Sequence, residues 1–117
     1  MKEIIFKMGT PSEALNITRL LLRNGFEPTK ATITYNLSKG LPGEIKKLSD
    51  YPLRLEGIYN GHELRVLVTP LAAGCSCEGS RALYHILRAA SFPIEERDIT
   101  TIRNVRNGEV NLFLSRK

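Results

Sequence analysis

Apolar residues that recur every three or four positions predict two amphipathic helices in this chain. Ahead of the first helix, Thr10 and Glu13 have the spacing of a capping box, and Pro11 suits the first helical position. Asn24 followed by Gly25 is typical of a helix end. The residues expected to face the core are Ala14, Leu15, Ile17, Thr18, Leu21 and Leu22 in the first helix, and Gly79, Ala82, Leu83, Ile86, Leu87, Ala89 and Ala90 in the second.

Strands are predicted where apolar residues alternate with polar ones. These segments lie near 4–8, 31–37, 53–59, 62–69, 98–106 and 109–115. Two Asn-Gly dipeptides, at 60–61 and 107–108, favour hairpin turns of two residues because asparagine and glycine tolerate positive φ angles. The expected cross-strand pairs are Glu56 with Arg65 and Leu55 with Val66 around the first turn, and Arg106 with Glu109 and Val105 with Val110 around the second.

The two helical segments align with each other without gaps, residues 9–28 on residues 74–93. The glycine before the helix, the capping glutamate, one exposed arginine and the proline after the helix coincide. The pattern is therefore β-α-β-β written twice, in residues 1–60 and 61–117, with an insertion at 38–50 where a short helix over 44–49 is expected. An α+β chain can show such self-similarity without any duplication, so both interpretations stay open.

This order of elements predicts one α+β domain built as a two-layer sandwich. The sheet is expected to be mixed or mostly antiparallel, with the two main helices on one face, an architecture related to ferredoxin-like folds. A length of 117 residues fits a single domain with its own core. Such an architecture by itself indicates no function.

Composition narrows the class of protein. With 42% hydrophobic and 25% charged residues, the chain is too apolar to be disordered. No apolar run approaches the roughly 18 residues of a membrane span, and Lys7 interrupts what would be the apolar segment of a signal peptide. We therefore expect a cytoplasmic protein without membrane contact.

The loop before the second helix is the most distinctive local sequence. Its small and polar residues are Gly74, Cys75, Ser76, Cys77 and Ser80. Backbone N–H groups at a helix start can hold a small anion, but the spacing matches no phosphate-binding motif, and Glu78 would repel a phosphate. A tight turn with a helix cap is the simpler interpretation.

The two cysteines are weak candidates for chemistry. Placed at a helix start, Cys75 or Cys77 could be a reactive thiolate, or the pair could be a redox couple. Two free cysteines in a reducing cytosol are the default expectation. His85 lies eight residues after Cys77, which is about 12 Å along a helix and too far to share one metal ion. We expect no metal and no cofactor.

No catalytic motif is visible in the chain. Neither G-x-S-x-G nor H-E-x-x-H occurs, and His62 directly follows a predicted turn, where an exposed, solvated histidine is expected. These observations favour a protein that is not an enzyme.

A basic stripe on the helices carries the leading functional hypothesis. The chain has 17 lysines and arginines against 12 aspartates and glutamates, a formal charge of +5. Arg81, Tyr84, His85 and Arg88 recur at helical spacing, and Arg19 and Arg23 occupy the comparable face of the first helix. Arginine with tyrosine suits phosphate contact and base stacking.

Three functions follow as alternatives. The first is a binding domain that contacts RNA or another anionic partner through the outer face of its helices. The second is a thiol-dependent or small-anion site at the loop 74–80. The third is a homodimer formed through an open sheet face or through the strand 109–115, where Phe113 is a candidate contact. A merely solvated helix face is the simplest explanation of the basic stripe.

Overall fold

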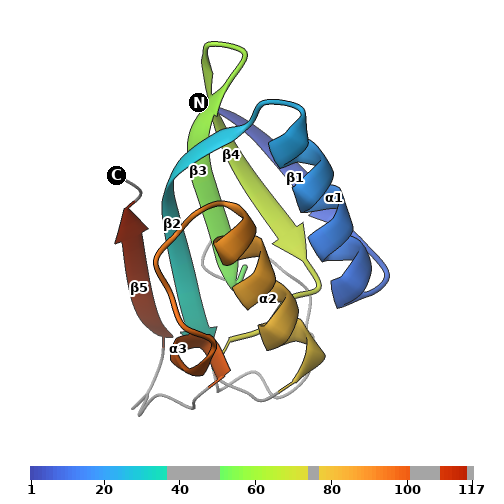
Figure 1. Ribbon diagram of the computed structural model, residues 1–117, viewed down its shortest axis with the longest axis vertical. Coiled ribbons are helices and arrows are strands. Elements are labelled where there is room, and N and C mark those ends of the chain that lie inside the picture. Colours follow the sequence, from blue (N-terminus) through green and yellow to red (C-terminus); the bar gives the residue numbers. More distant parts are fainter. Residues whose placement is uncertain (37–50, 74–76, 101–108, 116–117) are drawn as a thin grey trace.

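A strand from each end of the chain forms an edge of a five-stranded mixed sheet. The computed structural model describes residues 1–36, 51–73, 77–100 and 109–115 (Figure 1). Their strands are β1 (Lys2–Lys7), β2 (Glu27–Asn36), β3 (Leu53–Tyr59), β4 (His62–Thr69) and β5 (Glu109–Ser115). The order across the sheet is β1-β4-β3-β2-β5. Only the β1–β4 pair is parallel, and the other three pairs are antiparallel.

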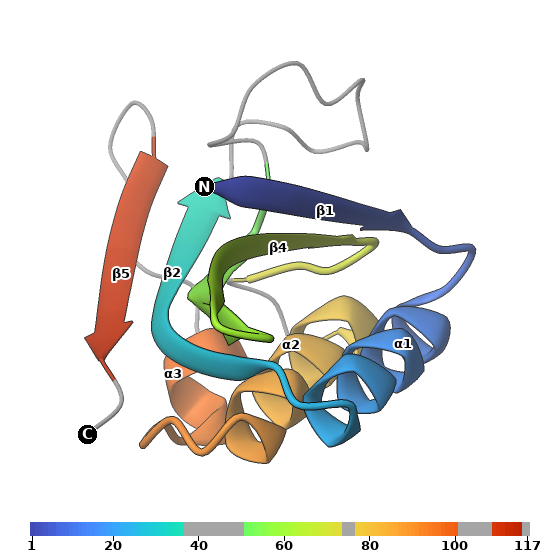
Figure 2. The same ribbon diagram turned by 90° about the horizontal axis from the view of Figure 1, so that it is seen from above.

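The helices cover one face of this sheet. Helix α1 (Pro11–Arg23) and helix α2 (Glu78–Ala89) lie side by side, and the short helix α3 (Glu96–Thr100) lies beside α2 (Figure 2). Because α1 follows β1 and α2 follows β4, and these strands are parallel, the two helices run in the same direction (Figure 1). The prediction of a two-layer α+β sandwich is confirmed. Its likeness to ferredoxin-like folds stays a prediction.

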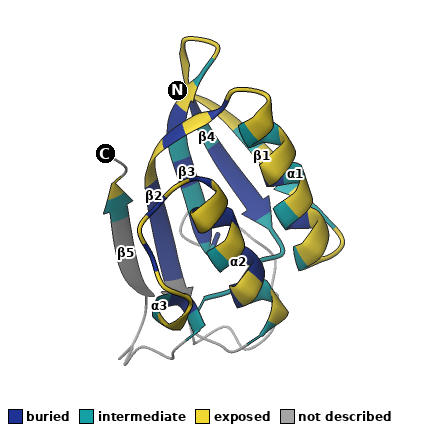
Figure 3. Ribbon diagram, viewed as in Figure 1, coloured by how far each residue is buried: buried dark blue, intermediate teal, exposed yellow. Residues whose placement is uncertain are grey.

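The core lies between the sheet and the helices. In β4, Leu64, Val66 and Val68 alternate toward this layer, as strand periodicity requires. Figure 3 shows β2 and β4 largely buried behind helices whose outward faces are exposed. The other buried members of the core are Ala14, Phe26, Ala31, Ile33, Leu53, Leu55, Leu83, Ile86, Leu87, Ala90, Phe92, Ile94 and Ile99.

The first predicted hairpin is confirmed. Asn60 and Gly61 have φ angles of 51° and 79° and connect Tyr59 to His62 in a turn of two residues. Beyond the turn, the predicted pairs of Glu56 with Arg65 and of Leu55 with Val66 are both present. The Asn-Gly turn was therefore sufficient to predict the register of β3 and β4.

The predicted strand over 98–106 is wrong where the structure describes it. Residues Glu96–Thr100 form helix α3 instead. An Asp98 side-chain oxygen accepts a hydrogen bond from the Glu95 N–H at 3.1 Å, and Ile99 is fully buried in the core, so a cap and an anchor together favour a helical turn. The predicted helix at 44–49 and the turn at 107–108 lie outside the described residues.

Strand β2 bends where it passes over β3. Its pairing with β3 shifts register between Pro28 and Lys30. Opposite this bulge, a Cβ atom on Gly57 would overlap the backbone of Glu27 and Pro28. Glycine at 57 therefore permits the close approach of the two backbones. On its other side, β2 pairs with β5 from Lys30 to Asn36.

Candidate nucleic-acid interface

Helix α1 presents two arginines on its outer face. Its start has a variant of the predicted capping box: the Thr10 hydroxyl accepts from the Glu13 N–H at 3.1 Å, and the Glu13 carboxylate accepts at 3.3 Å from the N–H of Gly9, one residue before the N-cap. This start places Arg19 and Arg23 on the exposed side of the helix, as helical periodicity predicts.

Helix α2 presents a second set, which differs in part from the prediction. His85 and Arg88 are exposed, as expected. Tyr84 was expected on the exposed stripe but is half-buried and packs against the core cluster. Its ring centroid lies 5.2 Å from that of His85, with the ring planes tilted by 59°. Tyr84 therefore contributes to packing more than helical spacing alone suggests.

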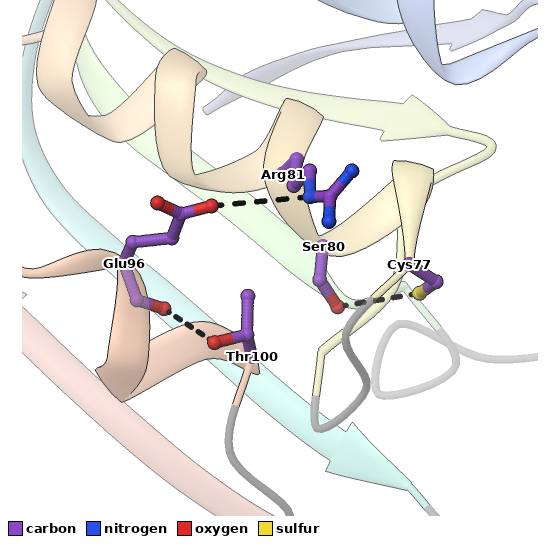
Figure 4. Close-up of polar contacts among 5 residues, drawn as sticks. All are labelled: Cys77, Ser80, Arg81, Glu96 and Thr100. Atoms are coloured by element: carbon purple, nitrogen blue, oxygen red, sulfur yellow. Dashed lines mark hydrogen bonds and ion pairs between the residues drawn. The ribbon is translucent and has the colours of Figure 1, made fainter.

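Arg81 has an acidic neighbour on α3. Its Nε lies 4.0 Å from a carboxylate oxygen of Glu96 (Figure 4). Both side chains are more than half exposed, at 61% and 53%, so the pair contributes little to stability. It nevertheless lowers the local positive charge around Arg81. Sequence periodicity does not indicate this partner, because Glu96 precedes a segment predicted to be a strand, whereas in the structure it begins a helix that packs against α2.

Charge is distributed unevenly along the two main helices. Arg19, Arg23 and Arg88 lie in the C-terminal halves, whereas Glu13 and Glu78 lie in the first turns. Because the helices are neighbours that run in the same direction, the three arginines occupy the same end of the helical layer. We call Arg19, Arg23, His85 and Arg88 the basic surface.

The arginines of the basic surface differ from several others in the molecule. Within the described ranges, no carboxylate lies at ion-pair distance from Arg19, Arg23 or Arg88. By contrast, Arg65 lies 3.3 Å from Glu3, and Arg97 lies 2.6 Å from Glu95. Arg19, Arg23 and Arg88 are therefore three arginines on adjoining helices without an ion-pair partner among the described residues.

Two further features belong to this face. Leu20 is 52% exposed and lies three residues before Arg23, on the same side of α1. The exposure of Leu20 can be predicted from the sequence, since helical spacing places this residue outside the apolar face of α1. In addition, Arg23 and Arg88 occupy the last turns of their helices, where a positive charge interacts favourably with the helix dipole.

The structure describes only part of the loop before α2. Gly74, Cys75 and Ser76 lie outside the described residues. Cys77 is the N-cap residue of α2 and is disulfide-bonded, so the expectation of a free thiol at this position is wrong. A disulfide sulfur has no proton to lose and is not a thiolate.

The buried end of this loop is polar. The Cys77 sulfur lies 3.6 Å from the hydroxyl of Ser80, which is fully buried (Figure 4). Because the disulfide sulfur carries no hydrogen, any hydrogen bond in this contact runs from the hydroxyl to the sulfur. Ser80 therefore lies within the packed start of α2 and is not a surface residue.

The remaining candidates are placed as follows. His62 is exposed directly after the β3–β4 turn. In the part of the chain that the structure describes, no three His, Cys, Asp or Glu side chains gather to hold a metal ion. Among the same residues, no helix has the length and apolar character needed to cross a membrane. Phe113 belongs to β5, where its backbone pairs with Thr32 of β2.

Comparison of the chain with protein-family models, with curated proteins and with solved structures finds no match in any of the three. The function is therefore inferred from the residues of the chain itself.

Proposed function

We propose that this protein is a non-enzymatic domain that binds RNA through the basic surface of its helical layer. The observation that carries the proposal is the position of Arg19, Arg23 and Arg88. They lie on two adjoining helices, at the same end of the layer, and the described residues provide no carboxylate partner for them.

The chemistry of these side chains suits phosphate. A guanidinium group presents several N–H donors in a plane and binds phosphate oxygens in pairs. Three such groups on neighbouring helices can contact successive phosphates of one strand. Arg81 contributes less in this arrangement, because Glu96 already lies beside its guanidinium.

The test is a fluorescence-anisotropy titration with a labelled single-stranded RNA over a range of salt concentrations. We expect the logarithm of the affinity to fall with the logarithm of salt concentration with a slope near −2, since each of three phosphate contacts contributes about −0.7. Replacing Arg19, Arg23 and Arg88 together by Gln should lower affinity at least tenfold and flatten the slope.

Two control variants separate charge from helix stability. The same three positions changed to Lys keep the charge at both helix ends, so we expect most of the affinity to remain. Arg97→Gln removes an exposed arginine of α3 that is paired with Glu95, and it should leave affinity unchanged. Affinity that ignores salt, or that survives the triple change to Gln, contradicts the proposal.

A further inference from the structure

The contact between Tyr84 and His85 assigns these two residues different tasks in the proposed RNA site. Tyr84 is half-buried and packs against the core, whereas its neighbour His85 is exposed. A residue that stacks on a base must offer a ring face to solvent. Stacking therefore suits His85 better than Tyr84, although the sequence favoured the tyrosine.

The geometry also favours a fixed position for the histidine ring. Side chains of consecutive residues on a helix normally point in different directions, yet these two ring centroids are 5.2 Å apart and the planes are tilted by 59°. Tilted aromatic pairs at such distances attract each other. Because Tyr84 is held by the core, this contact restricts the rotation of His85 and lowers the entropy lost when a base binds.

The neighbours of His85 place phosphate contacts on one side of it. Arg88 is three residues later, on the same face of α2, and has no acidic partner among the described residues. Arg81 is four residues earlier and lies beside Glu96. A strand with one base on His85 is thus attracted toward Arg88.

We infer that the partner is single-stranded RNA, with one unpaired base stacked on His85 and adjoining phosphates held by Arg88 and the α1 arginines. This inference rests on the proposed function and makes it more specific. Bases in a duplex are already paired and stacked, so they are not free to lie on an exposed ring. Duplex RNA should therefore bind more weakly than a single strand of the same length.

The test compares His85→Phe with His85→Leu in the full chain, with circular dichroism to show that both variants fold. The probes are a labelled oligouridine, the same strand with abasic sites, and an RNA duplex. Phe keeps a flat ring, so we expect an affinity for oligouridine within about threefold of the unmodified protein. Leu keeps apolar bulk without a ring and should lose about 5- to 150-fold, the range for one stacked base.

The outcomes distinguish this inference from the proposed function. Abasic RNA that binds as tightly as oligouridine, or a Leu variant that binds as tightly as the unmodified protein, overturns the stacking role while the phosphate contacts stand. A duplex that binds more tightly than the single strand overturns it as well. If no probe binds the unmodified protein, both the proposed function and this inference are wrong.

Discussion

The two main helices begin in opposite ways. At the start of helix α1, the side chains of Thr10 and Glu13 each accept a hydrogen bond from a backbone N–H, whereas the N-cap residue of α2, Cys77, makes no capping hydrogen bond with its side chain. The number of buried residues shows the opposite order, with more in α2 than in α1. Only Ala14 and Thr18 are buried in α1, and the buried residues of α2 are Ser80, Ala82, Leu83, Ile86 and Leu87. The helix with less tertiary packing has the stronger local signals.

The two helices end in the same way but with different residues. The Phe26 N–H donates to the Leu21 carbonyl and the Phe92 N–H donates to the Leu87 carbonyl, each across the last turn. Together with the bonds of Gly25 and Ser91 to the carbonyls two residues before the cap, these are Schellman motifs. The position that needs a positive φ is Gly25 in α1, at 104°, and Ser91 in α2, at 67°.

This comparison teaches that packing can replace local preference. A serine in the left-handed region is less favourable than glycine by about 1 kcal/mol. Helix α2 carries this cost at one end and lacks a side-chain cap at the other, yet its buried face holds it on the sheet. Helix α1 has no comparable buried face and depends more on its ends.

The largest expected difference comes from the leucines at equivalent positions of the two Schellman motifs. Leu87→Ala should lower the free energy of unfolding by about 2–5 kcal/mol, because Leu87 is fully buried and the change leaves a cavity. Leu21→Ala should cost only about 1–2 kcal/mol, since Leu21 is half-buried. Urea denaturation measures both. Equal losses would show that α1 and α2 do not differ in packing as described.

An intermediate effect is expected from exchanging the residues with positive φ. Gly25→Ala should destabilise the protein by about 1–2 kcal/mol for conformational reasons alone, because a Cβ there would meet no atom within 4 Å. Ser91→Gly should instead stabilise it by about 0.5 kcal/mol. Thermal unfolding of the two variants gives the signs. A stabilising Gly25→Ala would contradict the role given to that residue.

The smallest effect is expected at the start of α1. Thr10→Ala removes the hydroxyl that accepts from the Glu13 N–H and should cost about 1 kcal/mol. Thr10→Ser keeps an acceptor and serves as the control, with a change below about 0.5 kcal/mol. Hydrogen exchange of the amides in the first turn of α1 should increase in the Ala variant only. An unchanged exchange rate there would mean that the cap does not hold this end.

Features that depend on neighbouring residues were predictable from the sequence. The capping box at Thr10, the helix end at Asn24 and the turn at Asn60 all lie where short-range signals put them. Features that depend on distant residues were not. No local signal predicted the pairing of β5 with β2, which lies more than seventy residues away along the chain. The predicted hairpin partner of β5 lies mostly outside the described residues.

The same division applies to the candidate site and to the internal similarity. Periodicity placed Arg19, Arg23 and Arg88 on exposed faces correctly, but it could not reveal Glu96 beside Arg81 or the packing of Tyr84. The ungapped alignment also set Leu22 on Leu87, whereas the Schellman hydrogen bonds make Leu21 the counterpart of Leu87. The duplication stays a prediction.

The close approach of β2 to Gly57 limits which residues can replace this glycine. The bend of β2 passes so close to it that any larger residue must push β2 away from β3. Strand β2 is also the strand through which β5 joins the sheet. A substitution at residue 57 would therefore displace β2 and, with it, the edge strand β5, although residue 57 itself does not pair with β5.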